Sequence, residues 1–209
     1  MKILLLLAVL GQACFAGQLE VEYSSFYSHL KKIDKEDLNA LQFAFGFKKV
    51  EKSTLCHINH AAVITQKVTF PVEINAFERF TLPTEKALKM AKAVVSLDLT
   101  EPNNQCDMSV QLETKAEYLK TNYSVADLAM LNEQYKTFFD DMGSFLSFLM
   151  PSTKGLKLVF AQPPQVNSQH DGLSIVANEL ILSDDWLEAM SSELILAEKP
   201  LRIMAIVEK

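Results

Sequence analysis

Two segments of the chain alternate apolar and other residues with a period of two, and this alternation constrains the fold more than any other feature. The apolar positions are Leu41, Phe43, Phe45 and Phe47 in the first segment and Met108, Val110 and Leu112 in the second. Successive side chains of a β-strand point to opposite faces, so 41–48 and 106–113 are both predicted to be strands with one apolar face. An all-α fold would require both segments to be helical, which the alternation opposes.

Further strands are predicted where short runs alternate in the same way or are rich in β-branched residues. These runs are 19–23, 55–65, 68–75, 93–99, 156–160, 173–182 and 201–207. Pro71 restricts its strand to an edge or a bulge, because proline has no backbone donor. Short helices are predicted over 24–30 and 184–191, with Ser24 and Ser183 as their N-caps.

The longest predicted element is an amphipathic helix over residues 124–149. Ser124 is a favourable N-cap, Asp127 stands three residues later as in a capping box, and Pro151 ends the helix. Its apolar residues fall within an arc of about 120°. They are Leu128, Leu131, Tyr135, Phe138, Phe139, Met142, Phe145, Leu146 and Leu149. The sequence therefore predicts an α+β fold, with an antiparallel sheet or a β-sandwich-like layer packed by this one long helix.

The first sixteen residues have the order of a secretory signal peptide. Lys2 supplies a positive start, residues 3–10 are an unbroken apolar run, and small residues precede a cleavage site after Ala16. The run is shorter than the roughly 20 residues that span a bilayer. The interpretation is a periplasmic protein, with lipidation of Cys14 as a minor alternative. The predicted organisation is a signal peptide (1–16) and one α+β domain.

That domain covers residues 17–209. A sub-division is considered, with a β-rich half over 17–120 and a half over 121–209 that contains the long helix and the C-terminal strands. The sequence shows no internal repeat and no linker that would separate these halves.

Two cysteines remain after cleavage, Cys56 and Cys106. An even number of cysteines in an oxidising compartment predicts a disulfide. It would close a loop of about 50 residues and stabilise the fold by roughly 4 kcal/mol in the chain-entropy model. A metal site is not predicted, because His57 and His60 add too few ligands to Cys56 for zinc and face opposite sides of a strand. No cofactor is predicted either.

Several segments resemble a known family. They are 23–27 (YSSFY), 82–89 (LPTEKALK), 106–113 (CDMSVQLE) and 142–151 (MGSFLSFLMP). Together they resemble a family of small exported proteins of Gram-negative bacteria that carries only a domain-of-unknown-function label. The resemblance implies export and a cysteine bridge, and it implies no activity and no catalytic residues.

No catalytic residue is predicted. The chain has no Gly-x-Ser-x-Gly motif, and His170 lies in a polar loop, where it is interpreted as a hydrated turn residue. The paired carboxylates at 140–141 and 184–185 are adjacent in predicted helices, so they do not face each other. With 26 acidic against 20 basic residues, a nucleic-acid surface is not expected. The favoured interpretation is therefore a non-enzymatic binding or envelope-accessory protein.

The alternative is a hydrolase whose site is assembled from scattered residues. An apolar cavity would favour binding, and a cleft of convergent polar groups with a perturbed acid would favour an enzyme. Partners remain open between an envelope protein and an apolar ligand. The candidate contact face is Phe148 with Met150, which lie off the main apolar stripe of the long helix. The alternative for this face is a helix end buried in the core.

Overall fold

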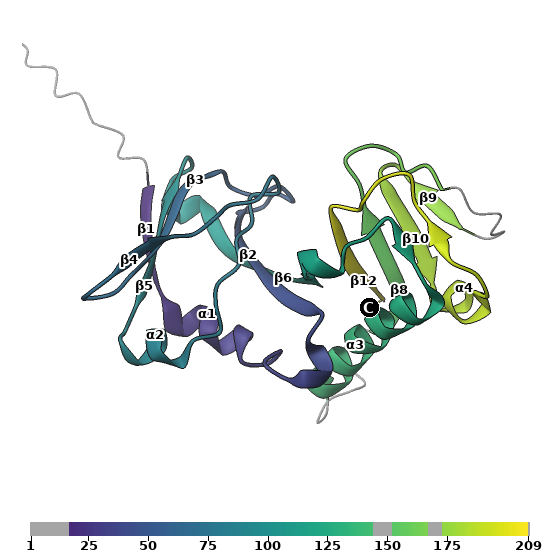
Figure 1. Cartoon of the computed structure of the whole chain (residues 1–209). Helices are drawn as coiled ribbons and strands as arrows, with labels where there is room; N and C mark the ends of the chain where they lie inside the picture. Colours follow the sequence, from purple (N-terminus) through teal and green to yellow (C-terminus); the bar gives the residue numbers. More distant parts are fainter. Residues whose placement is uncertain (1–16, 144–151, 167–172, 209) are drawn as a thin grey trace, which may run out of the picture.

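The computed structural model describes residues 17–143, 152–166 and 173–208, and it has an α+β fold with antiparallel sheets, as predicted. Two lobes lie side by side, with a two-stranded ribbon between them (Figure 1). The strands form four separate sheets in the described residues, so they do not make a single layer.

The first lobe is built on a four-stranded sheet in the order β1-β5-β3-β4. Its strands are β1 (Gly17–Glu22), β5 (Val94–Leu99), β3 (Ile58–Ile64) and β4 (Thr69–Pro71), and its helices are α1 (Tyr23–Leu30) and α2 (Lys86–Met90). β4 occupies an edge, as its proline predicts. The N-cap prediction for Ser24 is wrong. The helix begins one residue earlier because the Tyr23 amide bonds to the carbonyl of Ala93 at 2.9 Å and the Tyr23 ring is buried.

The ribbon pairs β2 (Leu41–Lys49) with β6 (Cys106–Thr114) along their whole lengths. Both were predicted from their alternation. The four apolar residues of β2 are buried, and the ring of Phe45 packs edge-on against Phe26 of α1 at 5.0 Å between centroids. The disulfide prediction is also confirmed. Cys56 bonds to Cys106, with their Cα atoms 6.3 Å apart, and thereby joins the start of β6 to the segment leading into β3.

The second lobe is built on a four-stranded sheet in the order β12-β8-β10-β9. Its strands are β12 (Arg202–Glu208), β8 (Ser152–Val159), β10 (Glu179–Ser183) and β9 (Ser174–Val176). A small pair is formed by β11 (Leu194–Ile195) and β7 (Asn122–Tyr123). The single strand predicted over 173–182 is wrong. It is a hairpin, because Ala177 adopts a left-handed conformation (φ 53°) and turns the chain.

Two helices belong to this lobe, α3 (Val125–Gly143) and α4 (Asp184–Ala189). The capping box is confirmed, since Ser124 Oγ accepts the Asp127 N–H at 3.1 Å and Asp127 Oδ2 accepts the Ser124 N–H at 3.0 Å. Ser183 Oγ likewise accepts the Trp186 N–H and caps α4. Residues 144–149 of the predicted helix lie outside the described residues. Four α-helices occur in the described residues, so helical packing is not supplied by one helix alone.

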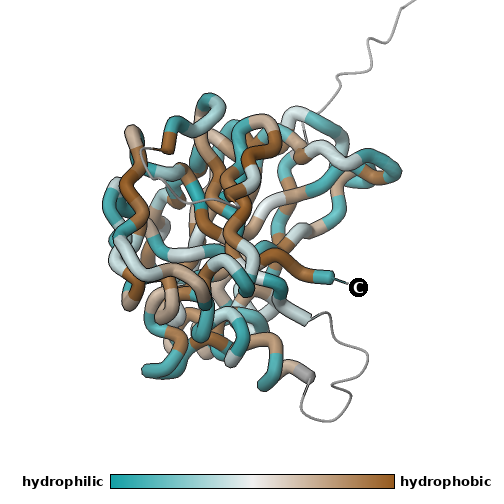
Figure 2. Tube along the Cα trace, turned by 90° about the vertical axis from the view of Figure 1, so that its right-hand side faces the viewer, coloured by the Kyte–Doolittle hydropathy of each residue, from teal (hydrophilic) through white to brown (hydrophobic). Residues whose placement is uncertain are grey.

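Three short 3₁₀-helices complete the described elements: Glu36–Leu38, Asn103–Gln105 and Ala116–Tyr118. Figure 2 shows many hydrophobic stretches of the chain within the body of the molecule and hydrophilic stretches at many of the outer turns. No helix in the described part of the chain is long and apolar enough to cross a membrane. The prediction that residues 17–209 fold as one domain stays a prediction.

The lobes are tied together at the ribbon. The hydroxyl of Tyr135, a fully buried residue of α3, donates to the carbonyl oxygen of Ile203 in β12 at 2.7 Å. The same hydroxyl lies 3.1 Å from Thr114 Oγ1 at the end of β6. One buried side chain therefore connects α3, β12 and β6. Its contact on β12 lies next to Arg202, the residue before Ile203.

Candidate functional site

The ribbon has one aromatic and one polar face, and the polar face carries the candidate site. Directly opposed residues of an antiparallel pair share a face. The pairs on the polar face are Gln42–Glu113, Ala44–Gln111, Gly46–Ser109 and Lys48–Asp107. A polar face of this kind is expected to meet solvent, yet Ala44, Gly46 and Glu113 are buried. Something must therefore cover this face.

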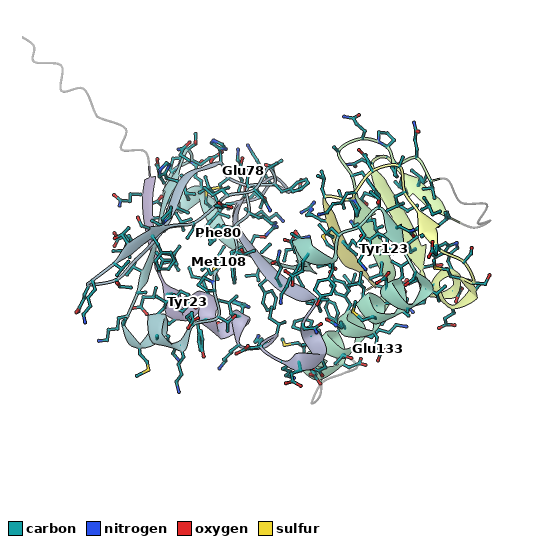
Figure 3. The ribbon with its side chains drawn as sticks, in the orientation of Figure 1. Tyr23, Glu78, Phe80, Met108, Tyr123 and Glu133 are labelled. Atoms are coloured by element: carbon teal, nitrogen blue, oxygen red, sulfur yellow. A yellow bond between two sulfur atoms is a disulfide. The ribbon has the colours of Figure 1, made fainter. Side chains whose placement is uncertain are left out.

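The cover is the loop that runs from Asn75 to Arg79. Asn75 Oδ1 accepts the backbone N–H groups of Phe77 at 2.9 Å and Arg79 at 3.1 Å, which closes the loop. Glu78 adopts a left-handed conformation (φ 55°), and its carboxylate accepts the Ile58 N–H at 2.9 Å. Glu78 lies at the end of the first lobe opposite Tyr23 (Figure 3). The loop is thus closed on itself by Asn75 and joined to β3 of the first lobe by Glu78.

The loop lies directly on the ribbon at Gly46. A Cβ atom at this position would be 2.8 Å from the Glu78 carbonyl oxygen, closer than real Cβ contacts. Glycine is therefore required here by the close approach of two backbones. The same approach lays the Arg79 side chain across the ribbon.

Arg79 is only 7% exposed. Its Nη1 donates to the Ala44 carbonyl oxygen at 3.2 Å, and its Nη2 donates to Ser109 Oγ at 3.2 Å. Burial lowers the pKa of Arg79, and the nearby charge of Arg202 lowers it further. Because a guanidinium group keeps its proton in proteins, the lowered pKa marks a charge that is held at a cost.

Arg202 reaches the same place from β12 in the second lobe. Its guanidinium stacks 4.0 Å above the centre of the Phe77 ring, and its Nη1 donates to Gln111 Oε1 at 3.3 Å. Burial lowers its pKa as well. Arg79 and Arg202 are the only two arginines in the 209-residue sequence, and the fold brings them to one site.

A pocket of about 580 Å³ opens between them. Its lining is Lys48, Ser53, Thr54, Leu55, Ala76, Phe77, Glu78, Arg79, Ser109, Gln111 and Arg202. This volume is in the range of small-molecule sites. In the described residues four buried side-chain nitrogen or oxygen atoms have no hydrogen-bond partner, and Arg79 Nε and Arg202 Nε are two of them. Two guanidinium groups therefore line the pocket, and each has a buried Nε without a hydrogen-bond partner.

A third such atom is Oε2 of Glu113, which is 5% exposed on the same face of β6. Its Oε1 accepts a hydrogen bond from Gln42 at 3.1 Å. Burial raises the pKa of this carboxyl, while Gln42 and the two arginines act in the opposite direction. Val110 and Leu112 on the predicted apolar face of β6 pack against the core, whereas Met108 on that face is exposed. Glu113 on the opposite face is buried because the loop and the second lobe cover the polar side.

The residues singled out from the sequence lie elsewhere. Phe148 and Met150, the predicted contact face, are outside the described residues, and so is His170. The disulfide sulfurs and the Glu101 carboxylate lie within 4.8 Å of one another, but bonded sulfurs offer no thiolate to a metal. Glu101 itself pairs with Lys49 at 2.5 Å.

The two histidines near Cys56 serve different neighbours. His57 Nδ1 contacts Glu78 Oε1 at 2.7 Å, whereas His60 Nδ1 contacts the carbonyl oxygen of Asn59. Asp184, at the start of α4, pairs with Lys136 of α3 at 3.0 Å. Neither histidine lines the arginine pocket, and Asp184 and Lys136 do not line it either, whereas Glu78 does.

The arginine pocket itself was missed from the sequence. Gly46 within a strongly alternating strand was the one local indication, because glycine in a strand often marks a close backbone approach. The other indication was the rarity of arginine, because nearly all the basic residues of the chain are lysines. Neither indication says that Arg79 and Arg202 meet.

A scan of protein families matches residues 15–160 to a family described as "Protein of unknown function (DUF2987)". The chain belongs to this family. The matched region contains every lining residue of the pocket except Arg202. A search of curated proteins found no match, and a search of solved structures found none.

Proposed function

We propose that this protein is an exported, non-enzymatic binding protein of the cell envelope, and that its arginine pocket takes a small ligand with a carboxylate or phosphate group. One observation carries the proposal: the two arginines of the chain lie in one pocket of about 580 Å³, each with a buried Nε that has no partner.

The chemistry of arginine supports an anion. A guanidinium group presents its donors in a planar fork that matches carboxylate and phosphate oxygens, which lysine cannot do. Burial is the main cause of the lowered pKa of Arg79, and the charge of Arg202 lowers this pKa further, so the two guanidinium groups repel each other. An anion between them would offset that repulsion. Lys48 and the hydroxyl groups of Ser53 and Thr54 line the same pocket and suit the remaining oxygens.

Export rests on the first sixteen residues and on the disulfide. We propose cleavage after Ala16 and a periplasmic location, and the Cys56–Cys106 bond is compatible with such an oxidising compartment. We propose likewise that the long helix continues to residue 149 and packs against the sheets. Phe148 and Met150 would then extend a contact face for an envelope protein or an apolar ligand.

A hydrolase is the second candidate, and the raised pKa of Glu113 favours it because perturbed acids are common in active sites. The pocket supports binding better. Glu113 does not line the pocket. Ser109 does line it, but its hydroxyl oxygen accepts a hydrogen bond from Arg79, a cation, and a nucleophilic serine needs a neighbouring base instead.

Isothermal titration calorimetry of the mature protein with acetate, succinate and phosphate monoesters tests the proposal. Arg202→Gln is expected to weaken binding of the anion that binds best by about tenfold or more, because a hydrogen bond to a charged group is lost. Lys199→Gln, an exposed change close to Arg202 in the chain, is the matched control and should leave the affinity unchanged.

Two outcomes contradict the proposal: no anion binds, or Arg202→Gln and Lys199→Gln have equal affinities. Turnover of a phosphate or carboxylate ester that Glu113→Gln abolishes would instead favour the hydrolase.

A further inference from the structure

A second surface lies at the opposite side of the first lobe from the ribbon, where α2 meets the turn between β3 and β4 (Figure 1). A hollow of about 710 Å³ opens between these elements. Its apolar lining residues are Val68, Phe70, Ala87, Leu88, Met90 and Ala91. Met90 is 74% exposed and Val68 is 58% exposed, so the two stand at the rim with their apolar surface in solvent. Large exposed apolar groups gathered in this way mark contact surfaces.

Four exposed lysines lie at or near this hollow. Lys67 in the turn and Lys92 after α2 line it. Lys86 and Lys89 belong to α2 beside it, and Lys89 Nζ lies over the Tyr27 ring at 5.4 Å from its centre. Neither segment, 65–70 or 86–92, contains an acidic residue. The whole chain has a net charge of −6, so this concentration of positive charge runs against the rest of the molecule.

Lys92 stands at a position that favours glycine. It ends α2 in the left-handed region, at φ 50°, and the following Ala93 N–H bonds back to the Leu88 carbonyl oxygen at 3.0 Å. Glycine reaches this conformation without strain and lysine does not. A lysine at this position therefore lowers stability while it adds charge to the surface.

We propose that this lysine-rimmed apolar surface docks on the surface of an anionic lipid bilayer. Met90 and Val68 would enter the boundary between headgroups and acyl chains, and the lysines would contact anionic headgroups. Exposed apolar side chains combined with lysines are the combination that binds such surfaces reversibly. A second copy of the chain fits less well, because it would bring the same four lysines against this surface.

Vesicle flotation with the mature protein tests the proposal. The protein is expected to float with phosphatidylglycerol vesicles at low salt and to remain unbound with phosphatidylcholine vesicles. Lys67→Glu combined with Lys86→Glu should lower the partition coefficient by about tenfold or more, because two headgroup attractions become repulsions. Lys154→Glu combined with Lys199→Glu, which makes the same charge change in the second lobe, is the control and should bind like the unaltered protein.

Two further variants separate docking from folding. Lys92→Gly should raise the melting temperature and weaken vesicle binding, a pair of effects that a purely structural lysine would not show. Met90→Ser should weaken binding and leave the melting temperature unchanged, because the side chain is exposed.

The proposal is overturned if neither vesicle binds, if both bind equally, or if the two charge-reversal pairs weaken binding equally. A dimer in sedimentation that Met90→Ser dissociates would assign the surface to a second copy and overturn it as well.

Discussion

Both faces of the β2–β6 ribbon are covered over most of their length, but by different kinds of contact. On one face Phe43 and Phe45 pack against other rings, among them Phe26, Phe80 and Phe138, and Phe47 is buried beside them. Ring packing requires volume and shape, and no atom needs a specific partner. On the other face every donor and acceptor needs one, and Arg79, Arg202 and Glu113 each keep an atom without one. The aromatic face thus stabilises the fold by packing alone, while the polar face keeps buried polar atoms without partners.

The largest expected effect is on the aromatic face. Phe45→Ala removes a fully buried ring at the centre of the cluster and should destabilise the protein by about 3–5 kcal/mol. Urea unfolding followed by circular dichroism measures this change. Phe77→Ala, on the polar face, is the comparison variant and should cost less stability, because its ring is only half-buried. Equal losses for the two variants would remove the distinction between the faces.

A smaller effect is expected where the two backbones touch. Gly46→Ala places a Cβ atom 2.8 Å from the Glu78 carbonyl oxygen, so the loop must move away from the ribbon. Overpacking of this kind costs about 1–3 kcal/mol. The same movement displaces Arg79, so anion binding measured by calorimetry should weaken in parallel. Unchanged stability together with unchanged binding would show that the loop is not held against Gly46.

The smallest effect concerns Glu113. Its folded-state pKa is raised by burial, so its contribution favours folding at pH values below the unfolded pKa, near 4.5. That contribution is lost as the pH rises through the folded value. Glu113→Gln keeps an acceptor for Gln42 and cannot ionise. The variant should therefore have a slightly higher melting temperature than the unaltered protein at pH 7 and the same one at pH 4.

Melting curves recorded from pH 4 to pH 8 check this prediction. A variant that is less stable than the unaltered protein at pH 7 would mean that the ionised carboxylate is held favourably by the two arginines. The polar face would then also stabilise the fold, and the contrast with the aromatic face would be smaller.

The sequence predicted the features that depend on neighbouring residues. The alternation at 41–48 gave the aromatic face, Ser124 and Asp127 gave the start of α3, and the cysteine count gave the disulfide. The turn at Ala177 was missed because the residue in the left-handed conformation is an alanine, and no glycine or Asn-Gly pair in the sequence indicates a turn there.

The arginine pocket depends on residues that are distant in the chain. Arg79 belongs to a loop of the first lobe and Arg202 to a strand of the second, and only the packing of both against β6 brings them together. No periodicity or spacing encodes that meeting. Loop placement of this kind is decided by tertiary contacts, such as the approach to Gly46, which local patterns do not contain.

The central position of β8 in its sheet determines how this protein can be shortened. β8 pairs with β10 on one side and with β12 on the other, and the family match ends one residue after it. A recombinant fragment that stopped at residue 160 would keep β8 and lose both neighbours. Two rows of unpaired backbone groups would then be open to other copies of the fragment, which is a direct route to aggregation. Expression of this protein as a monodisperse sample therefore requires the chain through Glu208.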